Sequence, residues 1–169
     1  NHIYYTTYNI FINEWRKTLT KISYSETDNV FPYLFIDSRD NIHILWYSLE
    51  NNNYLIKYKQ LSSMGKEKYH WKEIKLFKII LSKYPPLMLE KNNELKILCA
   101  SNDGIHSLIS KNYGLNWSVE DNIQLNDSEV HLIKYSHNAP LSSNYNKINH
   151  LYGTVEDDKV HYFFTEDLD

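Results

Sequence analysis

Apolar residues recur along the chain in short runs that polar turns separate. The runs at 41–46, 94–99 and 147–152 are similar to one another and begin 53 residues apart. Self-similarity at a fixed interval of about 50 residues indicates one structural unit that is used repeatedly. A polar turn precedes each run, so each run is predicted to be the second strand of a hairpin.

Other predicted strands flank these central strands. We expect first strands at 31–36, 86–89 and 130–135, and third strands at 54–58, 104–109 and 159–164. A fourth strand carries Trp71 or Trp117 in two of the units, and residues 2–6 with Trp15 indicate the end of an earlier unit. Each unit is therefore predicted to be a four-stranded antiparallel meander, which is the size of one β-propeller blade.

The central strands are apolar on both faces. Ile44 and Trp46 alternate with Leu45 and Tyr47, whereas a sheet with one face in water alternates apolar with polar residues. Neighbouring sheets that cover both faces would explain this pattern. A β-sandwich is the alternative, because its strands also recur at short intervals, but it does not predict the long repeat.

The fold class expected from these patterns is all-β, a β-propeller portion of about three four-stranded antiparallel blades. The blades are expected at 23–77, 78–125 and 126–169, after the end of a first blade at 1–22. Propellers have about 4 to 8 blades, so three blades cannot close a ring. We expect either a fragment of a longer chain or a homo-oligomer that completes the ring.

Composition agrees with a folded domain and narrows the possible partners. Of the 169 residues, 42% are hydrophobic and 23% are charged, with a net charge of -3. These values argue against disorder and against nucleic acid as a partner. No apolar run approaches the roughly 20 residues of a membrane span. Residues 1–5 are predicted to be a strand and lack the charged-then-apolar pattern of a signal peptide, so a leader that was removed or lies upstream is an open alternative. The single cysteine, Cys99, occupies the position of Trp46 in the repeat and is expected to be a small buried hydrophobe.

One turn resembles a known sequence motif. Residues 110–117 (Ser-Lys-Asn-Tyr-Gly-Leu-Asn-Trp) resemble the Asp-box, Ser/Thr-x-Asp-x-Gly-x-x-Trp, of sialidase-like (BNR-repeat) propellers. The structural residues of the box would be Ser110, Asn112, Gly114 and Trp117. Asn112 stands where the family usually has Asp; an amide oxygen also accepts hydrogen bonds, and glycine permits a positive φ. Weaker copies of the box are expected at 62–71 and 165–169.

The resemblance also implies what a catalytic member would need. A sialidase of this family binds the carboxylate of its substrate with three arginines, aided by an aspartate acid and a tyrosine nucleophile that a glutamate activates. This chain has two arginines, Arg16 and Arg39, and residues 30–32 read Val-Phe-Pro where the family has Arg-Ile-Pro. Catalysis by this stretch alone is therefore not expected. The alternative is a glycoside hydrolase or polysaccharide lyase whose active site is completed by blades outside this chain.

Carboxylate pairs and histidines give no independent sign of an active site. Asp37 with Asp40, and Asp157 with Asp158, would suit glycoside hydrolysis, but both pairs fall in predicted turns, where Asp is common. Five histidines fall within predicted strands and lack the spacing of a metal motif, namely His43, His106, His131, His150 and His161. We expect these histidines to pack or to form hydrogen bonds, and we expect neither a metal nor a cofactor.

Ligand binding is the function that remains after the sequence patterns argue against catalysis. Loops 23–30 and 78–84 between blades should share a rim with the loops at 49–53, 101–103 and 156–158. The rim residues suited to sugar hydroxyls are Tyr24, Glu26, Asp28, Glu50, Asn51, Asn52, Asn102 and Asp103. A merely solvated rim is the alternative.

The expected function is a non-catalytic sialidase-like module that binds glycan or protein ligands. A structural, self-assembling scaffold is a further alternative. The bias towards Asn, Ile, Lys and Tyr is typical of low-GC bacterial genomes, so we expect a bacterial cell-surface or secreted protein.

Overall fold

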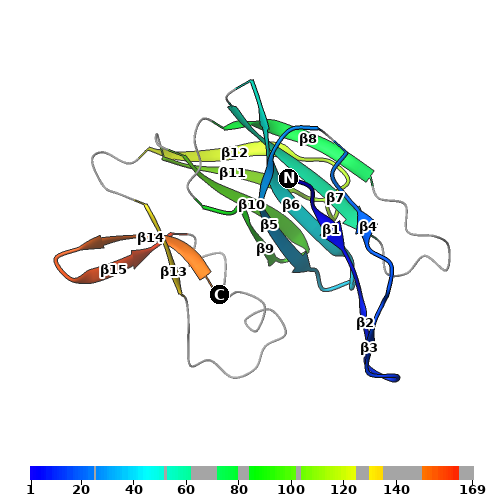
Figure 1. The fold of residues 1–169 in the computed structure, drawn as a ribbon. Helices are drawn as coiled ribbons and strands as arrows, with labels where there is room; N and C mark the ends of the chain where they lie inside the picture. The colour runs from blue at the N-terminus through cyan, green and yellow to red at the C-terminus, as the bar shows by residue number, and fades with distance from the viewer. Residues whose placement is uncertain are drawn as a thin grey trace.

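The chain is all-β wherever its structure is described. The computed structural model describes residues 1–24, 26–51, 53–61, 72–79, 84–101, 104–124, 130–134 and 150–163. Within these ranges every regular element is a β-strand, and the strands pair antiparallel (Figure 1). The all-β class expected from the sequence is therefore confirmed. No helix in these ranges is long and apolar enough to cross a membrane.

Two four-stranded meanders form the centre of the structure. The first sheet contains, in order, β5 (Asn29–Ile36), β6 (Ile42–Glu50), β7 (Asn53–Leu61) and β8 (Lys72–Ile79). The second contains β9 (Leu87–Lys91), β10 (Glu94–Ser101), β11 (Gly104–Ser110) and β12 (Ser118–Gln124). A third sheet contains β13 (His131–Lys134), β14 (His150–Glu156) and β15 (Lys159–Tyr162). Pairing between consecutive strands is what polar turns between apolar runs predict.

The N-terminal segment forms a long, narrow hairpin. Its pairs are β1 (Tyr4–Tyr5) with β4 (Thr20–Lys21), and β2 (Tyr8–Asn9) with β3 (Glu14–Trp15). The base of the hairpin packs on the first sheet, where Ile22 is buried with Ile44 and Trp46. The other end projects from the body of the molecule (Figure 1). The strands expected around residues 2–6 and at Trp15 are thus the two arms of this hairpin.

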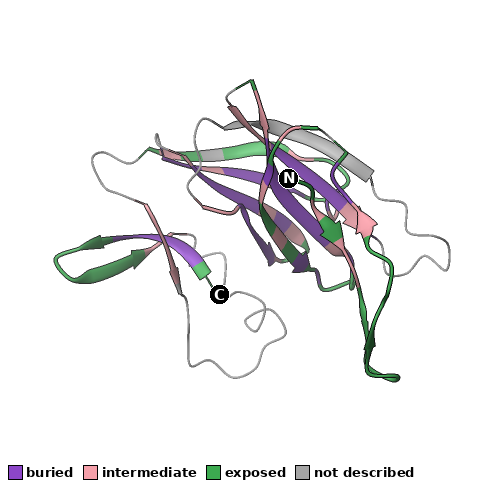
Figure 2. Cartoon of the chain, viewed as in Figure 1, coloured by how far each residue is buried: buried purple, intermediate pink, exposed green. Residues whose placement is uncertain are grey.

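The sheets pack against one another in chain order. Trp46, Cys99 and Tyr152 lie one repeat apart, and each packs on the preceding unit: Trp46 on the hairpin, Cys99 on the first sheet and Tyr152 on the second. Strands β6 and β10 are largely buried as a result (Figure 2). Their continuous apolar runs follow from this packing, because both faces of each strand are covered.

The hairpin turns are tighter than the sequence analysis predicted. Strands β6 and β7 stay paired up to Glu50 and Asn53, so Glu50 ends a strand and does not lie in a loop. Asn51, in the turn, has a φ of 51°, in the left-handed region that Asn tolerates better than most residues. Asp157 and Asp158 also have positive φ in the two-residue turn between β14 and β15, as such short hairpins require.

Candidate functional site

The turn between β5 and β6 is organised around a buried carboxylate. Asp37 accepts hydrogen bonds from the backbone N–H groups of Arg39 (2.9 Å) and Asn41 (2.8 Å), and from the Asn41 side chain (2.7 Å). Burial raises the pKa of Asp37, but hydrogen bonds with His43 and Asn41 outweigh burial and hold it below its usual value. Asp40 lies exposed in the same turn with a φ of 61°. These two carboxylates therefore serve the turn and do not form a catalytic pair.

A chain of buried hydrogen bonds continues from Asp37 into the sheet. His43 Nε2 lies 3.0 Å from Asp37 Oδ2, and His43 Nδ1 lies 2.8 Å from the Tyr58 hydroxyl oxygen. Burial, with the Asp37 charge, raises the pKa of Tyr58 and keeps its hydroxyl protonated. The Tyr58 side chain then meets the second sheet, where the Trp117 ring packs edge-on to it at 5.4 Å between centroids. A Cβ at Gly114 would lie 2.0 Å from the Tyr58 oxygen, so this contact requires glycine.

The turn at 110–117 is held by its own side chains. Ser110 Oγ donates to Asn112 Oδ1 (3.0 Å) and accepts from the N–H of Gly114 (2.8 Å). Asn112 Oδ1 also accepts from the N–H of Asn116 (2.8 Å). The φ of Gly114 is 84°, which favours glycine. The identification of this turn as an Asp-box stays a prediction, and these contacts are the ones that such a turn needs.

Further contacts join the first and second sheets on this side. Ser38 donates to the Glu90 carboxylate from its N–H (2.7 Å) and from its hydroxyl (2.5 Å). The Arg39 guanidinium lies 3.4 Å from the centroid of the Tyr113 ring. We refer to residues 37–43 and 110–117, with their partners Tyr58 and Glu90, as the locked edge. The side chains of Asp37, His43, Tyr58, Ser38 and Glu90 bond one another within the protein, which indicates a structural role.

The structure describes five of the eight residues that were predicted to form a binding rim. Glu50 forms an ion pair with the buried Lys57 (2.8 Å), which is paired with Trp46 in the register of β6 and β7 and so shares the face that packs on the hairpin. Tyr24 is exposed, and the Lys59 ammonium lies 4.4 Å from its ring centroid. These two predicted residues therefore face the hairpin side of the first sheet.

Of the other six predicted rim residues, three lie outside the described ranges. The Asp28 carbonyl accepts a hydrogen bond from the N–H of Leu49 (2.8 Å), so the inter-sheet segment does meet the end of β6. Glu26 and Asn51 are exposed. The structure does not describe Asn52, Asn102 and Asp103. The weaker box copies expected at 62–71 and 165–169 also lie outside the described residues.

A polar network that the sequence analysis did not single out lies at the other end of the second sheet. His106 Nε2 lies 2.8 Å from the Ser101 hydroxyl, and His106 Nδ1 lies 2.8 Å from Asn122 Oδ1. An amide oxygen only accepts, so Nδ1 donates to Asn122, and the Ser101 hydroxyl also donates to the Gly104 carbonyl (3.3 Å). His106 and Asn122 face each other across β11 and β12, and Asn122 is exposed. The network therefore reaches the protein surface at Asn122.

Three aromatic side chains lie on the side of the first sheet that packs against the second sheet. Phe31 and Tyr47 have ring centroids 6.4 Å apart, and Tyr47 and Tyr54 have centroids 5.9 Å apart. Tyr47 is fully buried and lies in the same hydrophobic core as the buried Cys99. Cys99 is paired with His106 in the register of β10 and β11, so His106 projects from the face that packs on the first sheet. We refer to these two groups together as the inter-sheet rim: Phe31, Tyr47, Tyr54, Ser101, His106 and Asn122.

Phe31 has the most unusual backbone of the rim. Its φ is 54°, in a region that bulky residues rarely occupy. The pairing of β5 with β6 is irregular between Val30 and Tyr33, and the Phe31 side chain is 37% exposed. Strained residues persist where the surroundings hold them, and they cluster at functional sites. The exposed ring of Phe31 therefore marks this rim as the candidate binding site.

Strand alternation is the signal that could have found part of this rim. Ser101 and Cys99 lie two residues apart on β10 and share a face, and His106 is in register with Cys99. The strain at Phe31 leaves no such signal, because it arises from the irregular pairing of β5.

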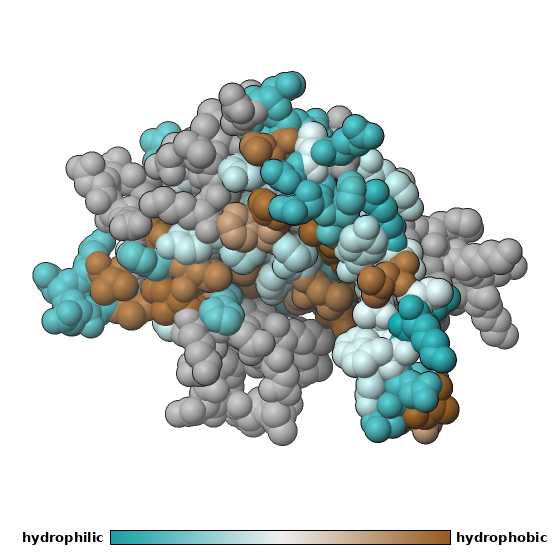
Figure 3. Space-filling view, in the orientation of Figure 1, coloured by the Kyte–Doolittle hydropathy of each residue, from teal (hydrophilic) through white to brown (hydrophobic). Residues whose placement is uncertain are grey.

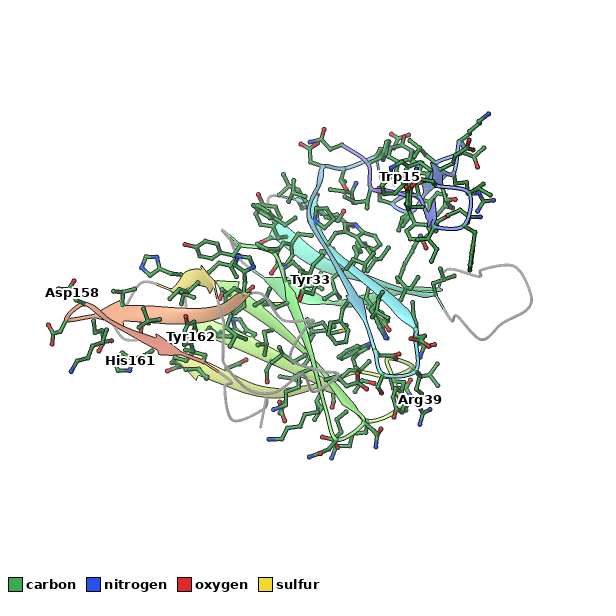
Figure 4. All side chains as sticks on the ribbon, turned by 90° about the horizontal axis from the view of Figure 1, so that it is seen from below. Trp15, Tyr33, Arg39, Asp158, His161 and Tyr162 are labelled. Atoms are coloured by element: carbon green, nitrogen blue, oxygen red, sulfur yellow. The ribbon has the colours of Figure 1, made fainter. Side chains whose placement is uncertain are left out.

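The described residues contain neither a metal-binding cluster nor a converging pair of arginines. No group of three or more His, Cys, Asp or Glu side chains there is arranged to hold a metal ion. Arg39 lies at the locked edge, and Arg16 follows Trp15 on the projecting hairpin; Figure 4 shows Arg39 and Trp15 well apart. The two arginines thus do not converge on the inter-sheet rim or on each other.

Comparisons with known proteins give one structural similarity. No family model matches the chain, and no curated protein matches it significantly. The chain is similar in structure to a mutant of NanB sialidase from Streptococcus pneumoniae, with 18% sequence identity and a TM-score of 0.46. The similarity covers 95% of this chain and 28% of the sialidase chain. This chain therefore spans about a quarter of that protein's length, and the activity of the longer protein is not carried over to it.

Proposed function

We propose that this chain is a non-catalytic portion of a sialidase-like β-propeller that binds glycans at the inter-sheet rim. The observation that carries the proposal is Phe31, a partly exposed aromatic ring held in a left-handed backbone conformation. The hydrogen-bonded side chains of Ser101, His106 and Asn122 on the second sheet supply polar groups. An aromatic face can cover the apolar side of a sugar ring, while hydroxyl, imidazole and amide groups bond sugar hydroxyls. Such a surface suits a neutral or weakly charged saccharide.

Two features support the propeller architecture. Consecutive strands form antiparallel meanders, and the sheets pack on one another in chain order so that residues 53 apart each face the preceding unit. Blades in a propeller repeat and pack in this way. We propose blades at 23–77, 78–125 and 126–169, following the hairpin at 1–22.

The arginines support binding without catalysis. Recognition of a substrate carboxylate favours bidentate arginine contacts, but Arg39 stacks on Tyr113 at the locked edge and Arg16 belongs to the hairpin region. At the rim itself, residues 30–32 are Val-Phe-Pro. We therefore expect this chain not to hydrolyse a fluorogenic sialoside.

The test is binding of the purified chain to a panel of immobilised neutral and sialylated oligosaccharides. Wild-type protein should bind at least one glycan class. Phe31→Leu, which keeps an apolar side chain but removes the ring, and Asn122→Ala should each lower the affinity for that class by about tenfold, as expected for the loss of one good contact. Thermal unfolding would show that both variants remain folded.

Lys111→Ala is the matched control, because Lys111 is a highly exposed residue at the locked edge. It should bind as wild type does. Absence of binding to every glycan, or equal losses in Lys111→Ala and Phe31→Leu, would contradict the proposal. Hydrolysis of the sialoside by this chain would contradict the non-catalytic role.

A further inference from the structure

The far end of the N-terminal hairpin carries an apolar tip. Ile10, Phe11 and Ile12 follow one another between β2 and β3, with 75%, 92% and 63% of their surfaces exposed. Figures 1 and 3 show the hairpin projecting from the body, with apolar residues at its end. Protein surfaces in water rarely present three consecutive large apolar side chains unless they are functional. The tip therefore indicates an interaction surface.

The tip is held in place by contacts within the hairpin. The rings of Tyr8 and Trp15 lie 5.2 Å apart between centroids, and the N–H of Phe11 donates to Asn9 Oδ1 (3.0 Å). The Tyr8 hydroxyl also bonds the Asn13 side chain. These contacts order the turn locally and present the apolar side chains outward.

Basic residues lie on the same hairpin, behind the tip. Residues 1–22 contain Arg16, Lys17 and Lys21 against a single carboxylate, Glu14, which makes a net charge of +2, whereas the whole chain carries -3. Trp15, immediately before the basic pair, is 64% exposed. The hairpin thus has apolar side chains at its tip, the exposed ring of Trp15 behind the tip, and basic side chains next to Trp15.

We propose that this hairpin docks on an anionic lipid bilayer, with its tip in the interfacial region. The three apolar side chains enter the boundary between headgroups and acyl chains. Trp15 and Tyr8 lie at the headgroup level, where these two residue types are enriched, and the basic residues meet the negative surface. The charge of the flank and the apolar tip are both explained by this one partner. The contact lies on the membrane surface and does not cross it.

Co-sedimentation with vesicles tests the proposal on the full chain. Wild-type protein should bind vesicles of phosphatidylcholine with phosphatidylserine more strongly than vesicles of phosphatidylcholine alone, and added salt should weaken this binding. Phe11→Asp should lower the partition coefficient by at least about tenfold. Leu115→Asp is the matched control, because Leu115 is 55% exposed in the turn of the locked edge and receives the same charge change. It should bind almost as well as wild type.

Two further measurements separate the charge from the apolar insertion. The double variant Arg16→Gln with Lys17→Gln should weaken binding about fivefold per charge removed. Tryptophan emission should shift to shorter wavelength when vesicles are added, because Trp15 leaves water, whereas Trp46 is already buried. Trp15→Phe should abolish most of this shift.

Several outcomes would overturn the proposal. The first is that the wild-type chain does not bind the anionic vesicles. The second is that Phe11→Asp and Leu115→Asp lower vesicle binding equally. The third is that light scattering shows Phe11→Asp converting a dimer to a monomer while vesicle binding stays unchanged. That result would mean that the tip contacts a second copy of the chain. None of these outcomes depends on glycan binding at the inter-sheet rim.

Discussion

The two ends of the central sheets use their polar groups in opposite ways. At the locked edge, Asp37, His43 and Tyr58 are buried and satisfy one another. At the inter-sheet rim, the network through His106 ends on the exposed Asn122. The same two meanders therefore provide cohesion between sheets at one end and a polar network that reaches the surface at the other. Substitutions at the first end should act on stability, and substitutions at the second should act on binding.

Gly114→Ala should have the largest effect on stability. The added Cβ would lie 2.0 Å from the Tyr58 oxygen, and the φ of 84° disfavours any side chain. We expect the free energy of unfolding to fall by about 3 kcal/mol or more. Urea unfolding followed by circular dichroism would measure this loss.

Tyr58→Phe provides the control for that substitution, because it removes the clashing oxygen. Combined with Gly114→Ala, it should cost clearly less than the sum of the two single changes, since they share one contact. Simple additivity would show that the sheets are not locked through this contact.

Asp37→Asn should have the next largest effect, about 2 kcal/mol, because it keeps the shape of the side chain but replaces an acceptor of several hydrogen bonds. The pKa of Asp37 is lowered in the folded state. Its contribution to stability is therefore present above the unfolded-state value of 3.8 and is lost as the pH falls through the lower folded-state pKa. The free energies of unfolding of wild type and Asp37→Asn should therefore converge as the pH falls through the acid range. If the difference in unfolding free energy between the two proteins stayed constant at all pH values, the ionised Asp37 carboxylate would not be the source of the stabilisation.

Arg39→Ala should have a smaller effect, about 0.5 to 1 kcal/mol, because it removes a guanidinium stacked on Tyr113. Asn122→Ala, at the other end of the sheets, should change stability by less than about 0.5 kcal/mol. Calorimetry on both variants would show which of the two substitutions lowers stability more. If Asn122→Ala proved the more destabilising of the two, the contrast between the edges would fail.

Much of the fold was predictable from local patterns, but the grouping of the site residues was not. The turn aspartates were predictable because Asp and Asn tolerate turn conformations that other residues avoid, and Asp40, Asp157 and Asp158 all have positive φ. Glu50 was predicted in the rim loop, but strand pairing continued through it and placed it against Lys57. Pairing length depends on the turn that both strands accept, which a strand pattern alone does not reveal.

By itself, the sequence determined that the chain is all-β, where its central strands lie and that those strands are covered on both faces. These features are local, because apolar periodicity and turn residues act over a few neighbouring positions. Only the tertiary structure decided that Gly114 must accommodate Tyr58, that Cys99 brings His106 to the face near Tyr47, and that Phe31 adopts a left-handed conformation. Each of these depends on atoms from different sheets or on an irregular pairing, and such contacts exist only once the sheets have packed.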